Sequence, residues 1–272
     1  MISVLNNVSS LISENALSST QASLQSTLTE LSTGLRLNSG SEDPAGISIA
    51  EGLGANIAAL TQSSQNASNG VGLLQTADGA LSQVTTLLNQ AVTIATEASN
   101  GGLTTDQATA ADTEFQSILS EINQIGSTTN FNGVAVFSAT PQTVFTSDGT
   151  ASGATTTSTT TGALSSTTLA LSADALTSTA TAATALTDIT AAIATVAATR
   201  GSIGASVNQL SADSNVENTE VTNLTSAQNN VQNADISSTV ANMTQYNVLE
   251  QTGMAALSQS NSAQQNVLKL LQ

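Results

Sequence analysis

The sequence predicts a mainly α-helical protein: a long antiparallel helical coiled-coil bundle that carries a small β-hairpin insert. Apolar residues recur at steps of three and four through most of the chain, which indicates amphipathic helices. The pattern stops in the middle of the chain, where residues 131–172 carry turn signals instead. The patterned stretches on either side have similar lengths, so they can pair as antiparallel partners.

The N-terminal stretch, residues 1–35, predicts a long helix with a thin apolar stripe. The stripe comprises Leu5, Val8, Ile12, Leu17, Leu24, Leu28, Leu31 and Leu35. Gly40 can adopt the left-handed conformation that closes a helix, so we expect the helix to end there. Asp43 and Pro44 suit the N-cap and the first position of the next helix.

A stricter heptad follows in residues 46–99. Its apolar positions stand seven apart, at Leu53, Leu60, Ala67, Leu74, Leu81, Leu88 and Ala95. A heptad of this length indicates coiled-coil contact with partner helices. Gly70, Gly72 and Gly79 each disfavour a helix by about 1 kcal/mol relative to alanine, but the unbroken seam predicts a continuous helix. A shorter helix that turns back is predicted around Phe115 and Ile122.

The middle region predicts hairpins and exposed loops. Asn132-Gly133 and Asp148-Gly149 are turn signals. The segment TTTSTTT, residues 155–161, is interpreted either as a plain polar loop or as a surface for O-glycosylation. Residues 138–182 hold only two acids, Asp148 and Asp174, and no basic residue, which argues against a catalytic site there.

The C-terminal half repeats the two patterns. Residues 186–231 alternate steps of three and four and place Arg200 at a seam position, so a helix matching residues 46–99 is expected. The last segment has a thin stripe again, at Val240, Met243, Leu249, Leu257, Val267 and Leu271. Its natural partner is the N-terminal helix.

Composition excludes several classes of function. Three basic residues against nineteen acids give a net charge of -16, which repels nucleic acid and anionic membranes. The chain has no histidine and no cysteine, which removes the usual metal ligands, His-assisted nucleophiles and disulfides. We therefore expect no enzyme activity, no cofactor and no metal. The N-terminus does not resemble a standard secretory signal, and no stretch approaches the roughly 20 apolar residues of a membrane span, so no membrane insertion is expected.

Several ordered motifs resemble those of bacterial flagellins. They are STGLRLNSGSEDPAGISIA, SQNASNGVGLLQTADGALSQV, INQIGSTTNFNGVAVF, LTSAQNNVQNADISSTVANMT and AQQNVLKLL. The resemblance covers roughly residues 1–137 and 183–272, and the large outer domains of longer members have no counterpart. It implies inner coiled-coil helices at 1–42 and 234–272, an outer helical domain from 43–137 and 183–233, and a short variable strand and loop insert at 138–182.

The resemblance also implies a function. The chain would be a structural subunit that forms a homopolymer, the extracellular flagellar filament used for swimming, after export by the flagellar type III system. Its other partners would be an export chaperone and the hook-associated and cap proteins. A hook–filament junction protein is the alternative, and a filament-borne adhesin is a further one.

The assembly interface is expected on the paired terminal helices. Its residues are Leu5, Val8, Leu24, Leu28, Leu31, Leu35, Arg36, Leu249, Leu257, Val267 and Leu271. Arg36 either stabilises the negative end of a helix dipole or bridges carboxylates or carbonyls of adjacent subunits, and the same alternatives hold for Arg200. Glu42 and Asp43 either stabilise the first turn of the next helix or contact another subunit.

Two further sites follow from the resemblance. The stretch RGSIGASVNQL resembles the region that tunes filament supercoiling, with Gly204 and Ala205 at close-packed positions. The region read by the vertebrate innate immune receptor for flagellin corresponds to Leu88, Gln90, Ile94, Glu114 and Ile118. Gln90 and Ile118 stand where arginines are common in the family, so weak receptor binding is expected, unless apolar contacts through Leu88 and Ile94 suffice.

Overall fold

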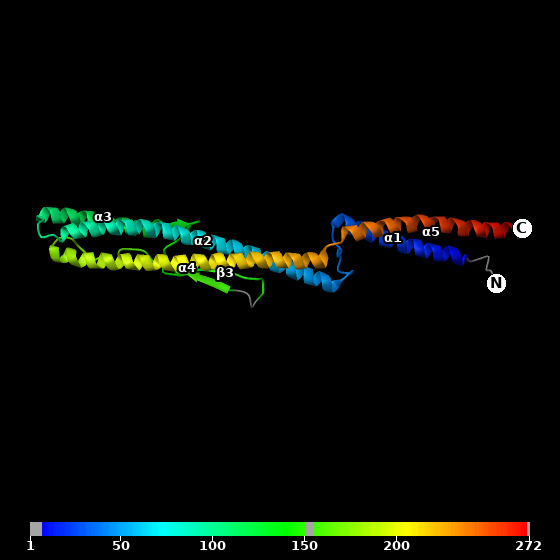
Figure 1. Cartoon of the computed structure of the whole chain (residues 1–272), viewed down its shortest axis with the longest axis horizontal. Helices are drawn as coiled ribbons and strands as arrows, with labels where there is room; N and C mark the ends of the chain where they lie inside the picture. Colours follow the sequence, from blue (N-terminus) through cyan, green and yellow to red (C-terminus); the bar gives the residue numbers. More distant parts are fainter. Residues whose placement is uncertain (1–6, 151–154, 271–272) are drawn as a thin grey trace. The chain divides into compact units, whose positions relative to one another are not determined.

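The computed structural model describes residues 7–150 and 155–270. Within these ranges the helices are α1 (Val8–Thr33), α2 (Pro44–Ala98), α3 (Thr105–Thr128), α4 (Thr179–Gln232) and α5 (Ile236–Leu270). The strands are β1 (Asn130–Phe131), β2 (Val134–Ala135), β3 (Gln142–Thr146) and β4 (Thr155–Thr159). The predicted mainly α-helical fold with a small hairpin insert is confirmed (Figure 1).

The chain divides into two compact units. Residues 56–222 form the first, here called the core unit, and residues 1–55 with 223–272 form the second, here called the helix-pair unit. The core unit holds most of α2 and α4, all of α3 and the strands. The helix-pair unit holds α1, α5 and the remaining ends of α2 and α4.

Helix α1 ends earlier than predicted. Its last turn is closed by Gly34, which has a φ of 72° and donates its N–H to the carbonyl of Glu30 at 2.8 Å. The prediction that Gly40 closes this helix is wrong. The chain leaves the helix at Gly34 because the next residues are extended and bond the segment after α4, where Leu35 forms an antiparallel bridge with Asn233.

Helix α2 begins where the sequence predicts. Pro44 is its first residue, and a proline there costs nothing because the first N–H groups of a helix have no partner inside it. The Oδ1 atom of Asp43 accepts hydrogen bonds from the backbone N–H of Ala45 at 3.1 Å and Gly46 at 2.9 Å. The predicted capping role of Asp43 is confirmed.

Gly70 and Gly72 of α2 make room for the strands packed on this helix. A Cβ atom at Gly70 would lie 2.7 Å from a methyl carbon of Val144 in β3, and one at Gly72 would lie 3.1 Å from the ring of Phe131 in β1. The helix runs unbroken through both positions, as predicted. The intrinsic cost of glycine is offset because any larger residue would push the hairpins away.

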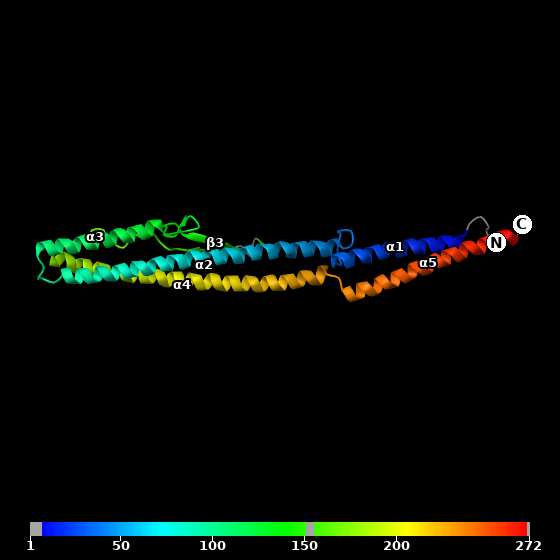
Figure 2. The same ribbon diagram turned by 90° about the horizontal axis from the view of Figure 1, so that it is seen from above.

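The core unit is built on three helices. The apolar seam of α4 is buried at Ile189, Val196, Ile203 and Leu210, each seven residues after the last, and it meets Leu74, Leu81 and Leu88 of α2 in one cluster. Helix α3 adds Phe115 and Ile122, which are fully buried. Figures 1 and 2 show α3 running back alongside α2, which confirms the predicted reversal. The heptad pattern therefore identified the core correctly.

Two antiparallel hairpins lie between α3 and α4 in the sequence. Asn132 and Gly133 have φ values of 52° and 79° and join β1 to β2, as the Asn-Gly signal predicts. Strand β3 pairs with β4 from Gln142↔Thr159 to Thr146↔Thr155. Asp148 and Gly149 lie in the connection between these strands, and Gly149 has a φ of 85°. The Asn132-Gly133 turn is confirmed, whereas Asp148 and Gly149 lie in a longer connection, part of which is outside the described residues.

The polar TTTSTTT segment is more ordered than predicted. Its first five residues form β4, and Thr157, Thr159 and Thr161 are buried. The hydroxyl of Thr159 donates to the carbonyl of Gln142 at 3.0 Å, and that of Thr161 donates to the carbonyl of Val136 at 2.5 Å. The interpretation as a plain polar loop is wrong, because threonine suits a strand and its hydroxyls find partners inside the unit.

Helix α4 is, among the helices in the described ranges, the one that is long and apolar enough to match a membrane span by length and composition. This differs from the sequence expectation, because alanine, isoleucine and valine between the threonines raise the mean hydropathy without forming an unbroken apolar run. Ala185, Ile189, Ala192 and Val196 of this segment are buried in the core unit. The apolarity is thus used by the packing of a core helix.

Candidate assembly interface

Helices α1 and α5 form an antiparallel pair, seen side by side in Figures 1 and 2. The hydroxyl of Ser10 donates to Oδ1 of Asn261 at 3.1 Å near one end of the pair. Further along, Nε2 of Gln21 donates to Oε1 of Glu250 at 3.2 Å. The predicted pairing of the terminal helices is confirmed for the described residues.

This pair buries very little of its own surface. Thr27 is the only buried residue in α1, and the predicted stripe residues Leu24, Leu31, Leu35 and Leu257 are half-buried. Val8, Leu28 and Leu249 are 61%, 47% and 43% exposed. The stripe therefore faces both the partner helix and solvent.

Several large apolar residues that are not among the predicted interface residues are also exposed on the pair, including two stripe residues, Ile12 and Val240. They are Leu11, Ile12, Val240, Val248 and Met254. The sequence pattern did not indicate Leu11, Val248 and Met254, because they are outside the single apolar stripe of each helix, although Leu11 continues the spacing from Val8 on a second face. Apolar side chains of this number on narrow helices indicate an interaction surface.

Three predicted interface residues cannot be placed. Leu5 and Leu271 lie outside the described residues, and so does the side chain of Val267. Their interface roles stay predictions.

Arg36 contacts the end of α4 within the helix-pair unit. Its Nη2 atom donates to the carbonyl of Val231 at 2.7 Å, and its backbone N–H donates to the carbonyl of Gln232 at 2.7 Å. The last carbonyls of a helix carry partial negative charge and lack partners inside the helix, so a guanidinium is favourable there. The guanidinium is exposed, and a bridge to another subunit stays a prediction.

Glu42 and Asp43 have local roles in the described chain. Oε2 of Glu42 accepts the backbone N–H of Asn38 at 2.8 Å, which holds the turn before α2. Asp43 caps α2, as described above. Both carboxylates are thus used within the unit. Asp43 stabilises the first turn of α2, as the local alternative predicts, whereas Glu42 bonds the turn before the helix instead.

Arg200 forms an ion pair inside the core unit. Its Nε and Nη2 atoms donate to Oδ1 and Oδ2 of Asp78 at 2.7 Å and 3.2 Å, a two-point contact between α4 and α2. Asp78 occupies a heptad position facing Arg200, and the hydrogen bond from Arg200 lowers the pKa of its carboxyl. The same bond raises the pKa of Arg200. The pair links neighbouring helices of one chain.

Gly204 and Ala205 are exposed on α4. A Cβ atom added at Gly204 would have no neighbour within 4 Å. Within one chain neither position is closely packed, and Gly204 lines a pocket with Leu74 and Asp78 of α2. A supercoil role at a contact between copies stays a prediction.

The region assigned to the immune receptor is split between surface and core. Gln90 and Glu114 are exposed, whereas Leu88, Ile94 and Ile118 are buried at 0%, 9% and 7% exposure. Leu88 and Ile94 are therefore buried in the folded chain, and a receptor contact through them stays a prediction without support from the structure. An arginine at Ile118 would disrupt the core, so only Gln90 is a useful position for testing.

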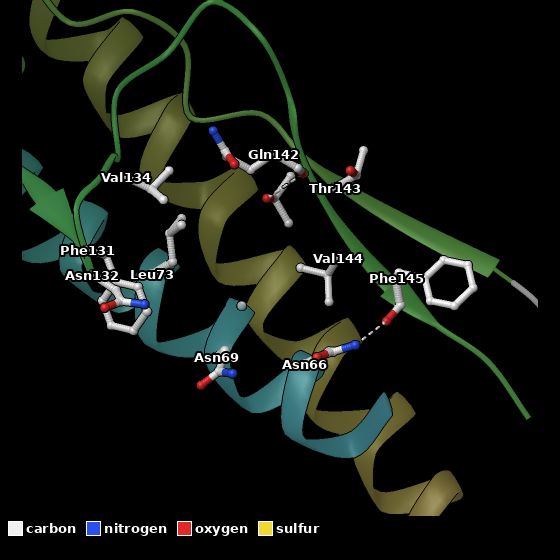
Figure 3. A pocket seen from close by; sticks show the side chains of 12 residues that line it. Asn66, Asn69, Leu73, Phe131, Asn132, Val134, Gln142, Thr143, Val144 and Phe145 are labelled. Atoms are coloured by element: carbon white, nitrogen blue, oxygen red, sulfur yellow. Dashed lines mark hydrogen bonds between the residues drawn. The ribbon is translucent and has the colours of Figure 1, made fainter. Parts of the chain in front are cut away.

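The hairpins cover α2 and leave an uncharged pocket that sequence reasoning did not find. It has a volume of about 530 Å³ and lies between α2 and the two hairpins (Figure 3). Nδ2 of Asn66 donates to the carbonyl of Phe145 at 3.1 Å, and Val144 lies over Gly70. Its lining residues carry no ionisable group, so the pocket offers no acid–base chemistry.

The comparisons with known families agree with this arrangement. The profile of the bacterial flagellin N-terminal helical region matches residues 4–142, and that of the bacterial flagellin C-terminal helical region matches residues 186–271. The chain is therefore a helical protein whose N-terminal and C-terminal regions both match the helical regions of flagellins. It belongs to the bacterial flagellin family.

Individual relatives are similar over half of the chain. Flagellin 1 of Proteus mirabilis is 39% identical over 139 residues, and flagellin of Serratia marcescens is 41% identical over 140 residues. Each match covers 51% of this chain, but only 38% and 40% of those relatives. The match thus spans about two fifths of the length of the curated relatives.

A solved structure is also similar. The crystal structure of Bacillus cereus flagellin has 27% sequence identity and a TM-score of 0.49. The match covers 56% of this chain and 88% of that one.

Proposed function

We propose that this chain is a structural subunit that polymerises with copies of itself into the extracellular flagellar filament and has no enzymatic role. Membership of the flagellin family supports the proposal. The observation that carries it is the helix pair α1–α5, which exposes large apolar residues on both helices. Copies of the chain that cover these residues would remove them from water, which favours assembly.

The assembly contacts proposed here centre on exposed stripe residues of the pair, with Val8 and Leu28 on α1 and Leu249 on α5. The half-buried residues Leu24 and Leu31 would hold the pair together while the exposed ones contact neighbouring copies. Family membership also supports export by the flagellar type III system, with an export chaperone and hook-associated and cap proteins as further partners.

The test replaces four exposed apolar residues of α1 in the full chain by serine, at Val8, Leu11, Ile12 and Leu28. Electron microscopy and sedimentation of the purified protein then measure polymerisation. We expect loss of filaments and a soluble monomer whose core unit unfolds at the same denaturant concentration as before.

The matched control replaces four exposed polar residues of the same helix by alanine, at Ser9, Asn15, Ser18 and Gln25. This variant should still polymerise, because no apolar contact is removed. Long filaments from the serine variant would contradict the proposed interface. Localisation of the native chain to a short ring at the filament base would instead favour a junction protein.

A further inference from the structure

One acid in the core unit is buried with incomplete hydrogen bonding. Glu217 lies on the seam face of α4 and is 7% exposed, so more than nine-tenths of it is removed from solvent. It follows Leu210 by seven residues and occupies a position that is apolar elsewhere in the seam. An ionised carboxylate in such a place is costly unless it is paired and fully hydrogen-bonded.

The hydrogen bonding of Glu217 is incomplete. Ser63 of α2, itself 2% exposed, donates its hydroxyl to Oε1 of Glu217 at 2.5 Å. The hydroxyl oxygen of Ser63 accepts the backbone N–H of Ser147 at 2.9 Å, in the segment that follows β3. Oε2 of Glu217 is buried and has no hydrogen-bond partner. A relay of three residues thus joins α4, α2 and the β3–β4 connection.

The surroundings of Glu217 are acidic. It lines a pocket of about 270 Å³ together with Asp213 and Glu220 of α4 and Asp148 of the β3–β4 connection. Helix α2 contributes only the uncharged Leu60 to the lining, and no lysine or arginine lines the pocket. The guanidinium of Arg200 is already paired with Asp78.

The pKa values of Glu217 and Asp148 shift in opposite directions. Burial is the main cause that raises the pKa of Glu217, with Asp213 and Glu220 adding to it, while the hydrogen bond from Ser63 acts in the opposite direction. Hydrogen bonds from Thr150 lower the pKa of Asp148, which is at the surface. Asp148 therefore stays ionised over a pH range in which Glu217 is protonated.

We propose that Glu217 carries a proton in the folded core unit and serves as a proton-dependent latch for the segment after β3. In the acid form with the proton on Oε2, Oε1 is the carbonyl oxygen and still accepts the hydroxyl of Ser63, whose oxygen accepts the N–H of Ser147. Oε2 then belongs to a neutral carboxyl group, whose burial costs far less than that of a carboxylate.

Loss of the proton reverses this balance. It creates a buried negative charge that has an unpartnered oxygen and faces Asp213, Glu220 and Asp148. The proposed relief is that the segment from Thr146 to Gly149, whose first three residues line the pocket with Glu217, moves away from α2 and admits water to Oε2. Gly149 packs tightly there, since a Cβ atom on it would lie 2.9 Å from Oδ1 of Asn56. The latch is thus closed at low pH and opens as the pH rises through the raised pKa of Glu217.

Hydrogen exchange of the purified full-length monomer, followed by mass spectrometry, tests the latch. The reading is the protection factor of residues 142–150 between about pH 4.5 and 8, corrected for the intrinsic exchange rate. The protection of the Ser147 amide should fall as the pH rises, by up to about tenfold per pH unit, which is the limit for one proton. Glu217→Gln keeps the shape without the charge, so its protection should not depend on pH.

The matched control is Glu121→Gln, an exposed acid of α3 that does not line this pocket. It should retain the pH dependence of the native chain. Carboxyl-carbon NMR of the native monomer should show Glu217 titrating above the usual glutamate range, a reading that needs no variant. Protection that is independent of pH in the native chain would overturn the proposal. Restoration of protection by Ca²⁺ at pH 8 in the native chain would also overturn it, in favour of a cation site.

Discussion

The core unit and the α1–α5 pair are built from the same kinds of residue, yet they bury them very differently. Phe115, Leu74, Leu81 and Ile189 of the core unit are at most 2% exposed. In α1 only Thr27 is buried, and Ile12 is 64% exposed. The difference arises from the number of neighbours, because α2 and α4 are covered by α3 and the hairpins, whereas in the described part of the chain α1 packs mainly against α5.

The comparison indicates which part of the chain is stable alone. A closed apolar cluster can offset the conformational entropy lost on folding, while a two-helix contact with a few half-buried leucines supplies much less. The core unit is therefore expected to fold in the monomer, and the pair is expected to gain its full stability when further copies cover it. The following predictions test this difference.

The largest effect is expected in the middle of the core unit. Phe115→Ala removes a fully buried ring and leaves a cavity, so the free energy of unfolding should fall by about 3–5 kcal/mol. Denaturation of the monomer followed by circular dichroism measures it. The control Glu121→Ala, at an exposed position of α3, should change it by less than about 0.5 kcal/mol. Equal effects would show that the core unit is not a packed unit in the monomer.

The next effect concerns the exposed surface of the core unit. Gln90→Arg adds a guanidinium at a position where the family resemblance expects one, and should strengthen binding to the immune receptor by up to about 2 kcal/mol. Because Gln90 is exposed, stability should not change. A reporter-cell titration with monomer measures the gain, and Gln90→Lys controls for charge alone. Unchanged potency would count against this site.

A smaller effect is expected for the ion pair between α2 and α4. Arg200 and Asp78 are 36% and 42% exposed at their side chains, so Arg200→Gln should destabilise the core unit by no more than about 1 kcal/mol at pH 7. The lowered pKa of Asp78 means that its contribution is present above the ordinary aspartate range and is lost as the pH falls through the folded pKa. Urea denaturation from pH 7 to 3 should show the two proteins converging. A difference in unfolding free energy between the two proteins that grows toward low pH would contradict this predicted direction.

The smallest effect on monomer stability is expected in the helix pair. Leu28→Ala removes a side chain that is 47% exposed, so the monomer should lose less than about 0.5 kcal/mol. The critical concentration for polymerisation should nevertheless rise if neighbouring copies cover this residue. Measuring both quantities on one preparation separates the two roles. A large loss of unfolding free energy in the monomer, with no change in the critical concentration, would show that Leu28 stabilises the pair itself and not the contacts between copies.

Much of the fold could be predicted because heptad spacing depends only on local sequence. The seam of α4, the start of α2 at Pro44 and the Asn132-Gly133 turn all follow from such local rules. The end of α1 could not, because Gly34 and Gly40 are equally suited to closing a helix and the choice depends on contacts with residues 231–234.

The candidate site was less predictable, because it too depends on contacts between residues that are far apart in the sequence. The stripe on α1 was visible, but the exposure of Leu11 depends on how few helices cover the pair. The pairing of Arg200 with Asp78 joins residues 122 positions apart, and spacing alone did not indicate which charge faces which. Glu217 was visible at a seam position, but its missing partner depends on the side chains that converge there from α2 and the strand connection.

The register of β3 and β4 also determines where the chain can be lengthened. Thr146 and Thr155 are the last paired residues of the hairpin, so the two ends of the connection between them are held side by side. The entropy of closing a loop grows only slowly with its length, by about 0.6 kcal/mol for each doubling. A peptide or small domain inserted after Thr150 would therefore leave the helical framework nearly as stable as before. Each copy in a polymer would then display one inserted peptide or domain.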